Sequence, residues 1–455
     1  MNLATPRMSD WNAAIGARLV GGDTRFDGVF TDSREPCAGG VFIALRGPRF
    51  DGHAHVAAAV AAGAAGIMAE EEQAVTVPQW VVPDTRRALG DLGRAWRRAW
   101  GGRLGALTGS NGKTTVKEMV AAILAPLGPL LATEGNLNNE LGVPLTLLRL
   151  RPAHRLAVVE MGANHPGEIA GLAALAEPDV GLVTNAGPAH LEGFGDILGV
   201  ARAKGELFAG LAPDGTAVIN NDDVYRDQWR STAGDRAVLT FGREAGADVR
   251  VRPTGEDVGA AGQSLRVETP WGCDETRLPL PGPHNVMNAA AAAAMALALG
   301  ATLEQVCTGL AQAPGVAGRL YRHAGCHGGC VIDDSYNANP GSLAAAIAVL
   351  AEEPGRRILV LGDMGELGDT AWQWHGRAGS MADAAGIDAL YTIGPLAAEA
   401  VETFGPEGRA FTTVAELVDA LVTTMDNNTT VLLKGSRAAG LDRVATELTG
   451  AGEAH

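Results

Sequence analysis

A glycine-rich turn near position 110 has the residue types of a phosphate-binding loop. It reads Thr108-Gly109-Ser110-Asn111-Gly112-Lys113-Thr114-Thr115. In such a loop the backbone N–H groups at the start of a helix bind an anion. A lysine reaches the terminal phosphates, and a Ser or Thr hydroxyl binds Mg²⁺. Lys113 and Thr114 would take these roles, although Leu107 stands where the strict pattern has its first glycine.

The residues on both sides of this turn predict a strand and a helix. Residues 104–108 form a short apolar run, and apolar residues recur at helical spacing over 116–124. The turn alone would be weak support, because it could arise by chance in a chain with 61 glycines. With the strand before it and the helix after it, a phosphate site is the better interpretation than a turn with an exposed lysine.

Candidate metal ligands follow two other predicted strands, 156–160 and 180–184. Glu160 ends the first, and the loop after the second contains His190. Ligands bind beyond the carboxyl ends of the strands in such sheets, so both residues fall on the phosphate side. A carboxylate suits Mg²⁺, whereas histidine is an unusual ligand for this ion. Taken alone, His190 is more typical of a hydrogen-bonded loop residue, and Lys204 of an ordinary helix lysine.

Other polar residues allow two interpretations each. Asn138 and Asn139 could bind a polar ligand or stabilise a turn. Asn285 and Asn288 could cap a predicted helix over 289–299 or contact a base. Three residues lie in loops of the first eighty positions, where they could grip phosphate or carboxylate or simply be solvated: Ser33, Arg34 and Arg46.

The order of predicted elements favours an α/β protein of several domains. The chain has 455 residues and is 46% hydrophobic, which is enough for two to four cores. Strands alternate with helices, as in largely parallel sheets, and those over 357–361, 389–393 and 430–433 indicate a Rossmann-like C-terminal domain. We place the domains at 1–83, 84–315 and 316–455, with Asp84 capping a helix over 85–100.

Charge and cysteine content exclude some functions. A net charge of −16 argues against nucleic-acid binding. The longest apolar helical run is too short to insert in a membrane. Five scattered cysteines and an interrupted N-terminal apolar stretch favour a cytoplasmic protein. One tract has cysteine and histidine spacing that would allow zinc binding: His323, Cys326, His327 and Cys330. Only one such tract is present, which argues against a zinc site but leaves it open.

An ordered set of motifs resembles the Mur ligase family along nearly the whole chain. The motifs lie at 31–34, 44–47, 50–53, 108–115, 135–139, 160–164, 189–195, 203–206, 284–288, 334–340, 361–368 and 434–437. Each is weak alone, but their order is specific. The missing first glycine of the phosphate loop is also usual in this family.

The resemblance implies an ATP-dependent amide ligase of cytoplasmic peptidoglycan precursor synthesis. It is closest to the members that add D-alanyl-D-alanine to UDP-N-acetylmuramoyl-tripeptide through an acyl phosphate. It implies three domains: a small α/β substrate domain, a central P-loop ATPase domain with a mostly parallel sheet, and a C-terminal Rossmann-like domain. We expect a monomer that uses ATP and two Mg²⁺ ions. The alternatives are a Mur-type ligase that adds a single amino acid and a P-loop regulatory NTPase. The third peptide residue, diaminopimelate or lysine, stays open.

The resemblance also implies roles for individual residues. The residues expected at the catalytic centre are Lys113, Glu160, His190 and Lys204. Those expected to bind Mg²⁺ are Thr114, Glu160, His190 and a carbamoylated Lys204. ATP is expected to contact the loop Thr108-Gly109-Ser110-Asn111-Gly112-Lys113-Thr114-Thr115 and, beyond it, Asn285, Asn288, Arg319 and Asp334. The UDP end is assigned to Ser33, Arg34 and Arg46, and the muramyl-peptide side to Asn138 and Asn139.

Overall fold

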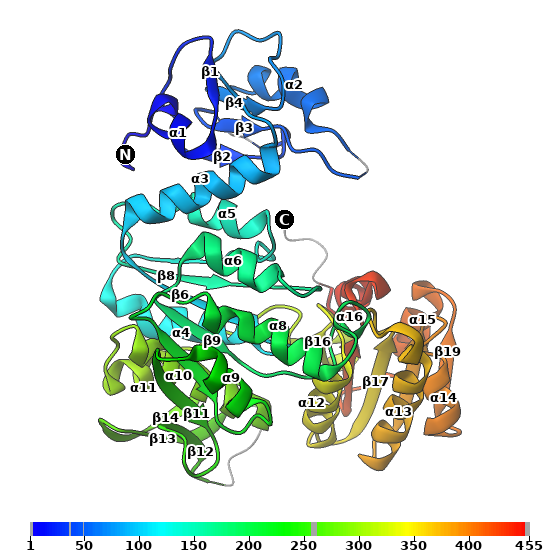
Figure 1. Cartoon of the computed structure of the whole chain (residues 1–455). Helices are drawn as coiled ribbons and strands as arrows, with labels where there is room; N and C mark the ends of the chain where they lie inside the picture. Colours follow the sequence, from blue (N-terminus) through cyan, green and yellow to red (C-terminus); the bar gives the residue numbers. More distant parts are fainter. Residues whose placement is uncertain (1–2, 36–37, 49, 256–261, 451–455) are drawn as a thin grey trace.

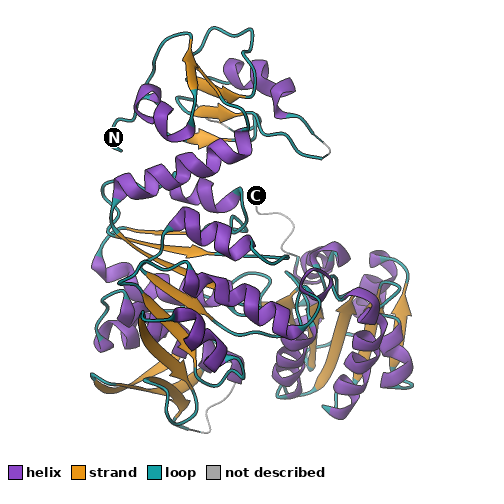
Figure 2. Ribbon diagram, viewed as in Figure 1, coloured by secondary structure: helices purple, strands orange, loops and turns teal. Residues whose placement is uncertain are grey.

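The computed structural model contains three α/β units, each with its own sheet (Figures 1 and 2). It describes residues 3–35, 38–48, 50–255 and 262–450. In Figure 1 the first unit lies at the top, the central unit below it and the third, coloured yellow to red, beside the central unit. The predicted three-domain α/β architecture is therefore confirmed. The boundaries at 83/84 and 315/316 stay predictions, and each sheet lies within its predicted range.

The first unit is a small sheet whose strand order is β1-β5-β4-β3-β2. Its strands are parallel except β1, which runs antiparallel to β5. The strands are β1 (Arg18–Val20), β2 (Val29–Phe30), β3 (Val41–Ile43), β4 (Gly66–Ala69) and β5 (Gln79–Val81). The short helices are η1 (Met8–Trp11), α1 (Asn12–Ile15), η2 (Gly52–His55) and α2 (Val56–Ala61).

Helix α3 (Thr85–Trp100) connects the first unit to the central one. As predicted, Asp84 caps it: the carboxylate accepts a hydrogen bond from the Arg87 N–H at 3.0 Å. The buried Trp96 of α3 stacks on Trp11 of the first unit with ring centroids 4.7 Å apart. The Trp96 indole also donates to the Leu150 carbonyl of the central unit, so one side chain joins the two cores.

We expect Asp84→Ala to lower the free energy of unfolding by about 1 kcal/mol, because a helix N–H loses its acceptor. Denaturant-induced unfolding followed by circular dichroism measures this change. Asp84→Asn is the matched control, since asparagine caps a helix as well as aspartate does. Equal stability of the Ala and Asn variants would contradict the capping role.

The central sheet brings the predicted phosphate loop and metal ligands together. Its strand order is β14-β13-β12-β11-β10-β9-β6-β8-β7, so β6 lies between β8 and β9, and all three are parallel. Their carboxyl ends therefore meet at one edge. The strands are β6 (Arg103–Thr108), β7 (Leu130–Ala132), β8 (Leu156–Glu160), β9 (Val180–Val183), β10 (Thr216–Asn220), β11 (Ala237–Gly242), β12 (Val249–Pro253), β13 (Gln263–Thr269) and β14 (Gly272–Leu278).

Helices cover both faces of this sheet (Figure 2). One face packs against α4 (Lys113–Leu124), α10 (Pro283–Ala298) and α11 (Leu303–Ala311). The other packs against α3, α5 (Gly142–Leu147), α6 (Glu168–Ala176) and α8 (Ile197–Ala209). Helices α7 (Leu191–Phe194) and α9 (Arg226–Ala233) complete the unit.

Two of these helices begin earlier than the apolar spacing predicts. Helix α4 begins at Lys113 and α10 at Pro283, each after a glycine with positive φ. Gly282 is the N-cap residue of α10, so Asn285 and Asn288 lie inside the helix. The alternative that either asparagine caps α10 is therefore wrong.

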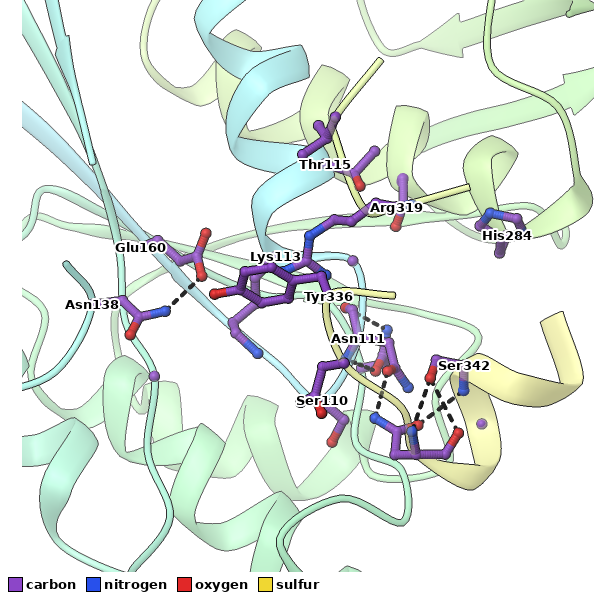
Figure 3. A pocket seen from close by; sticks show the side chains of 18 of the residues that line it. Ser110, Asn111, Lys113, Thr115, Asn138, Glu160, His284, Arg319, Tyr336 and Ser342 are labelled. Carbon is purple, nitrogen blue, oxygen red and sulfur yellow. Dashed lines mark hydrogen bonds between the residues drawn. The ribbon is translucent and has the colours of Figure 1, made fainter. Parts of the chain in front are cut away.

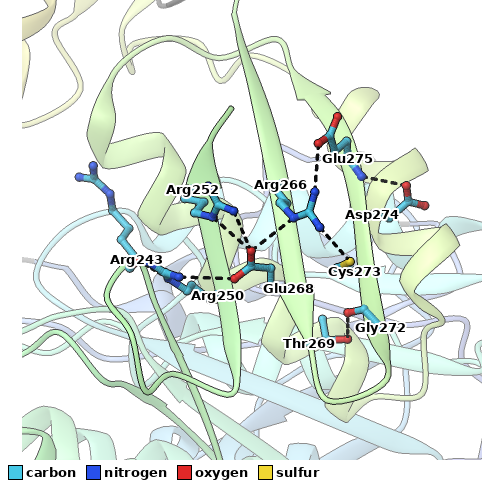
Figure 4. A network of polar contacts seen from close by, with 10 residues as sticks. All are labelled: Arg243, Arg250, Arg252, Arg266, Glu268, Thr269, Gly272, Cys273, Asp274 and Glu275. Carbon is cyan, nitrogen blue, oxygen red and sulfur yellow. Dashed lines mark hydrogen bonds and ion pairs between the residues drawn. The ribbon is translucent and has the colours of Figure 1, made fainter. Parts of the chain in front are cut away.

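The antiparallel strands β12 to β14 carry a network of charged side chains (Figure 4). The Glu268 carboxylate lies within 3.5 Å of the guanidinium groups of Arg250, Arg252 and Arg266. Because these groups are partly exposed to water, such pairs add little stability. All four residues lie on β12 and β13, so the network joins two neighbouring strands of the sheet.

The third unit is a sheet of order β15-β16-β20-β17-β18-β19, parallel except for β15. Alternate residues of β17 enter opposite cores: Ile358 and Val360 face one, Leu359 and Leu361 the other. The strands are β15 (Tyr321–Ala324), β16 (Cys330–Asp334), β17 (Arg356–Gly362), β18 (Ala389–Ile393), β19 (Gly408–Phe411) and β20 (Thr429–Lys434). The helices are α12 (Pro340–Ala351), α13 (Ala371–Ala384), α14 (Glu399–Phe404), α15 (Val414–Thr424) and α16 (Leu441–Thr449).

The cysteine and histidine tract lies in the hairpin between β15 and β16. Cys326 Sγ lies 3.8 Å from Met425 Sδ. Within the described ranges no three His, Cys, Asp or Glu side chains are grouped as metal ligands. The four cysteines in those ranges are free, and Cys37 lies outside them. In the same part of the chain, the helices are too short or too polar to cross a bilayer.

Candidate active site

A cavity of about 810 Å³ lies between the central and C-terminal units (Figure 3). It contains most of the residues that the sequence singled out. The predicted residues that line it are Ser110, Asn111, Gly112, Lys113, Thr115, Asn138, Asn139, Glu160, His190, Asn285, Asn288, Arg319 and Asp334. The predicted residues outside its lining are Thr108, Gly109, Thr114, Lys204, Ser33, Arg34 and Arg46.

The glycine-rich loop has a backbone that only glycine adopts without strain. Gly109 has φ 148° and Gly112 has φ 82°. A Cβ at Gly109 would collide with the Thr184 side chain, and one at Gly112 with Asn288. Gly112 is followed at once by α4, so the N-terminus of this helix borders the cavity. That end of a helix favours an anion.

Lys113 turns back onto the loop: its Nζ donates to the Gly109 carbonyl at 2.7 Å. Burial lowers the pKa of Lys113, while the Glu160 charge opposes this shift. The loop after β9 supports the same segment from outside, because Asn185 Oδ1 accepts the Asn111 N–H at 3.0 Å. The ammonium group is thus held beside the loop rather than in solvent.

Glu160, at the end of β8, joins the phosphate loop to the asparagine-rich turn. The residue is 2% exposed, and its carboxylate accepts hydrogen bonds from the Thr114 hydroxyl at 2.9 Å and the Asn138 amide at 2.8 Å. Figure 3 shows the bond between Asn138 and Glu160. A carboxylate and a hydroxyl side by side are donors that suit Mg²⁺, so this pair fits the ion. Asn139 instead accepts the N–H groups of the turn that leads to α5.

His190 has the left-handed backbone conformation, with φ 55°. Its Nδ1 contacts the Glu366 carboxylate of the C-terminal unit. The hydrogen bond from His190 lowers the pKa of the Glu366 carboxyl group. The histidine therefore holds the two units together here while it lines the cavity.

Lys204, on α8, is fully buried behind the cavity. Its Nζ lies 3.3 Å from the Ala163 carbonyl and 5.3 Å from the centre of the Phe194 ring. Burial, with a smaller contribution from the Lys113 charge, lowers the pKa of Lys204 to about 7. The amine is therefore about half neutral at neutral pH, unlike that of a solvated lysine.

The C-terminal unit supplies the opposite wall. Strands β16 and β20 are neighbours, which places Asp334 beside Lys434; the Lys434 Nζ donates to the Asp334 carboxylate at 2.6 Å. Burial raises the pKa of Asp334, against the charge of Lys434. The guanidinium of Arg319 lies over the Tyr336 ring, 4.3 Å from its centre.

Many residues that line this cavity were not predicted as site residues from the sequence, and three of them carry ionisable or aromatic side chains beside the predicted ones: His284, Tyr336 and Lys434. Lys434 ends a strand, the same signal that selected Glu160. His284 and Tyr336 lie within polar motifs of the sequence, but nothing else in the sequence indicates that they line a site. Burial, and then the Lys434 charge, lower the pKa of His284 to about 4, so it is neutral near pH 7.

The low pKa of His284 predicts a loss of stability in acid. The unfolded chain binds the proton below pH 6.5, whereas the folded chain does so only below about 4. The free energy of unfolding should therefore fall as the pH drops from about 7 to about 5, by about 1–2 kcal/mol from this residue. Urea unfolding of His284→Gln at about pH 7 and about pH 5 measures this change. An unchanged pH dependence in the variant would contradict the assignment.

The candidate residues of the first unit do not line this cavity. Arg34 pairs with Asp32, and Arg46 pairs with Asp51 and Glu70. Ser33 lies in the same turn as Arg34. Both arginines are thus exposed and paired with nearby carboxylates in the structure. A role for them at the UDP end stays a prediction.

Three family models match the chain in order. They are described as Mur ligase family, catalytic domain (residues 25–97), Mur ligase middle domain (107–296), and Mur ligase, glutamate ligase domain (318–437). The chain belongs to the Mur ligase family. The sequence-based prediction of an ATP-dependent ligase of this family is confirmed.

Relatives named for one activity match the chain over nearly its whole length. It is 43% identical to UDP-N-acetylmuramoyl-tripeptide–D-alanyl-D-alanine ligase of Escherichia coli K12, covering 97% of this chain and 98% of that protein. It is similar to a crystal structure of MurF from Acinetobacter baumannii, with 38% identity, a TM-score of 0.92 and coverage of 99% and 100%. It is also similar to MurF of Thermotoga maritima in complex with ADP, with 28% identity, a TM-score of 0.80 and coverage of 93% and 97%.

Proposed function

We propose that this chain condenses UDP-N-acetylmuramoyl-tripeptide with D-alanyl-D-alanine, using ATP, in cytoplasmic peptidoglycan precursor synthesis. The observation that carries the proposal is the cavity of about 810 Å³ between the central and C-terminal units. It joins a phosphate loop, an acidic strand end and the charged wall of the C-terminal unit. We infer that the chain acts as a monomer, because the cavity is built from one chain.

The chemistry needs an activated acid, since a carboxylate at neutral pH is a poor acyl donor. A carboxylate oxygen of the tripeptide attacks the terminal phosphorus of ATP, and ADP leaves with the electron pair of the broken P–O bond. The amine of D-alanyl-D-alanine then attacks the carbonyl carbon of the acyl phosphate. Inorganic phosphate leaves, and the nitrogen loses a proton to give the amide.

The residues would act by positioning and by charge. Lys113 would move from the Gly109 carbonyl to the terminal phosphates of ATP, and Arg319 would approach the same charge from the opposite wall. The remaining loop residues, 108–115, would bind the phosphates through their N–H groups. Asn285 and Asn288 would contact the base from α10, with Asp334 on the side of the C-terminal unit.

Mg²⁺ would neutralise phosphate charge when bound. We assign its ligands to Thr114, Glu160, His190 and Lys204, with two ions in the site. Lys204 suits this role only as a carbamate, in which a neutral Nζ forms a bond to the carbon of CO₂ and loses a proton. Its burial supports this, because its Nζ contacts the Ala163 carbonyl and forms an ion pair with no carboxylate of the described ranges. A carbamate would supply the missing oxygen donor.

The acyl donor, UDP-N-acetylmuramoyl-tripeptide, would extend from the first unit to the cavity. We assign its UDP end to Ser33, Arg34 and Arg46, and its muramyl-peptide part to Asn138 and Asn139. Asn138 supports this assignment best, because it binds the Glu160 carboxylate inside the cavity. The two arginines would have to exchange their present carboxylate partners for phosphate.

The test is the mass of the product. Purified chain, ATP, Mg²⁺ and UDP-N-acetylmuramoyl-tripeptide are incubated with D-alanyl-D-alanine or with single amino acids. The proposal predicts a gain of one dipeptide less water. A gain of one amino acid would instead assign the chain to another Mur-type activity. Nucleotide hydrolysis without any ligation would favour a regulatory NTPase.

A further inference from the structure

A second cavity, of about 410 Å³, lies beside the first, between helices α3 and α6. The two cavities share three lining residues: Glu140, Gly162 and Glu168. The second cavity is therefore continuous with the wall that carries the candidate phosphate and metal residues. None of the residues assigned so far to ATP or Mg²⁺ lines it within the described ranges.

The floor of this second cavity is apolar, and a glycine beside it leaves space that a larger side chain would fill. It is formed by Leu172 and Leu175 of α6 with Gly171 beside them. A Cβ at Gly171 would have no atom within 4 Å, so packing does not require a glycine there. By contrast, a Cβ at Gly93 of α3 would lie 3.0 Å from Pro144. Glycine inside a helix costs about 0.5–1 kcal/mol relative to alanine, so its use at 171 needs another reason, and open space is one.

One side chain connects the cavity to the first unit. Arg86, at the start of α3, donates from Nε to the Arg46 carbonyl at 3.0 Å. The same guanidinium lies 3.5 Å from the Glu140 carboxylate on the shared rim. At the other end, the Gly162 N–H binds the Asn138 carbonyl at 2.8 Å, and Asn138 binds Glu160. The cavity thus spans the path from the first unit to the acidic strand end.

We propose that this second cavity binds the peptide of the acyl donor; this rests on the proposed function. The nucleotide of the donor belongs at the first unit and its reacting carboxylate beside Glu160. The peptide must bridge the distance between them. An apolar floor suits aliphatic parts of a peptide and not a phosphate or a ribose. Gly171 provides the room over α6, and Leu172 and Leu175 provide the contact.

Gly171→Leu tests this by filling the cavity with a side chain that favours the helix. The expected result is a KM for UDP-N-acetylmuramoyl-tripeptide raised by between about tenfold and a hundredfold. The KM values for ATP and D-alanyl-D-alanine should not change. Inhibition by UDP-N-acetylmuramic acid, which lacks the peptide, should keep its Ki. Ala174→Leu is the matched control: it is exposed on the same helix, lines neither cavity and should leave all four constants unchanged.

An unchanged KM for the tripeptide substrate in Gly171→Leu would overturn the assignment of the cavity. So would an equal loss of affinity for UDP-N-acetylmuramic acid, because the substitution would then act on the nucleotide or sugar. Failure of the unaltered chain to turn over this substrate would overturn the proposed function itself. That outcome is visible before any variant is made. Thermal unfolding of both variants should stay within a few degrees of the unaltered chain, which separates lost binding from lost folding.

Discussion

Lys113→Ala should lower kcat/KM for ligation by about a thousandfold or more. The partly buried ammonium of Lys113 is the cation of the phosphate loop, and Arg319 lies on the opposite wall of the cavity. Negative charge is redistributed over the terminal phosphoryl group and the leaving oxygen of ADP during the first step. A preorganised cation stabilises this charge in the transition state. Phosphate release measured with both substrates present would report the loss.

The fold of this variant should stay intact, because the substitution removes a partly buried charge that donates a hydrogen bond to the Gly109 carbonyl. Circular dichroism and thermal unfolding are the controls. Ligation at the normal rate by a folded Lys113→Ala variant would remove this loop from the reaction.

Lys204→Ala should reduce ligation by about a hundredfold to a thousandfold, and a short-chain carboxylate should partly restore it. The substitution would delete the carbamate oxygens and leave space next to Phe194, which the added carboxylate would occupy. The measurement is the rate at increasing carboxylate concentration. Lys113→Ala is the matched control, because added carboxylate cannot replace its cation.

A spectroscopic readout separates this role from a structural one. With ¹³C-labelled bicarbonate, the unaltered chain should show a carbamate carbon signal that Lys204→Ala lacks. The signal should grow as the pH rises through the pKa of about 7, since only the neutral amine reacts with CO₂. Full activity of unrescued Lys204→Ala would contradict the assignment as a metal ligand.

Residues with a local signal could be predicted from the sequence. The run 156–160 is the strand β8 and 389–393 is β18, because buried parallel strands are continuous apolar runs. Asp84 has the residue type and position of an N-cap, and it caps α3. The beginnings of α4 and α10 were missed, since a glycine with positive φ precedes each helix and no side chain caps it.

Contacts between distant segments could not be predicted. Asn339 Nδ2 donates to Asn111 Oδ1 at 2.8 Å, although 228 positions separate them. The pair His190–Glu366 likewise depends on how two units dock. The local pairing of Arg34 and Arg46 with acidic neighbours was also missed, because short-range ion pairs depend on loop conformation. Spacing along the chain indicates which residue types meet at a sheet edge, but it does not specify their partners.

The most direct test of the central claim is the coupling of ATP cleavage to both other substrates. Phosphate release should be measured with UDP-N-acetylmuramoyl-tripeptide alone, with D-alanyl-D-alanine alone and with the two together. A cavity that joins the three reactants predicts sustained release only with both present, with one phosphate for each amide formed. Sustained release that does not depend on either substrate would contradict the account.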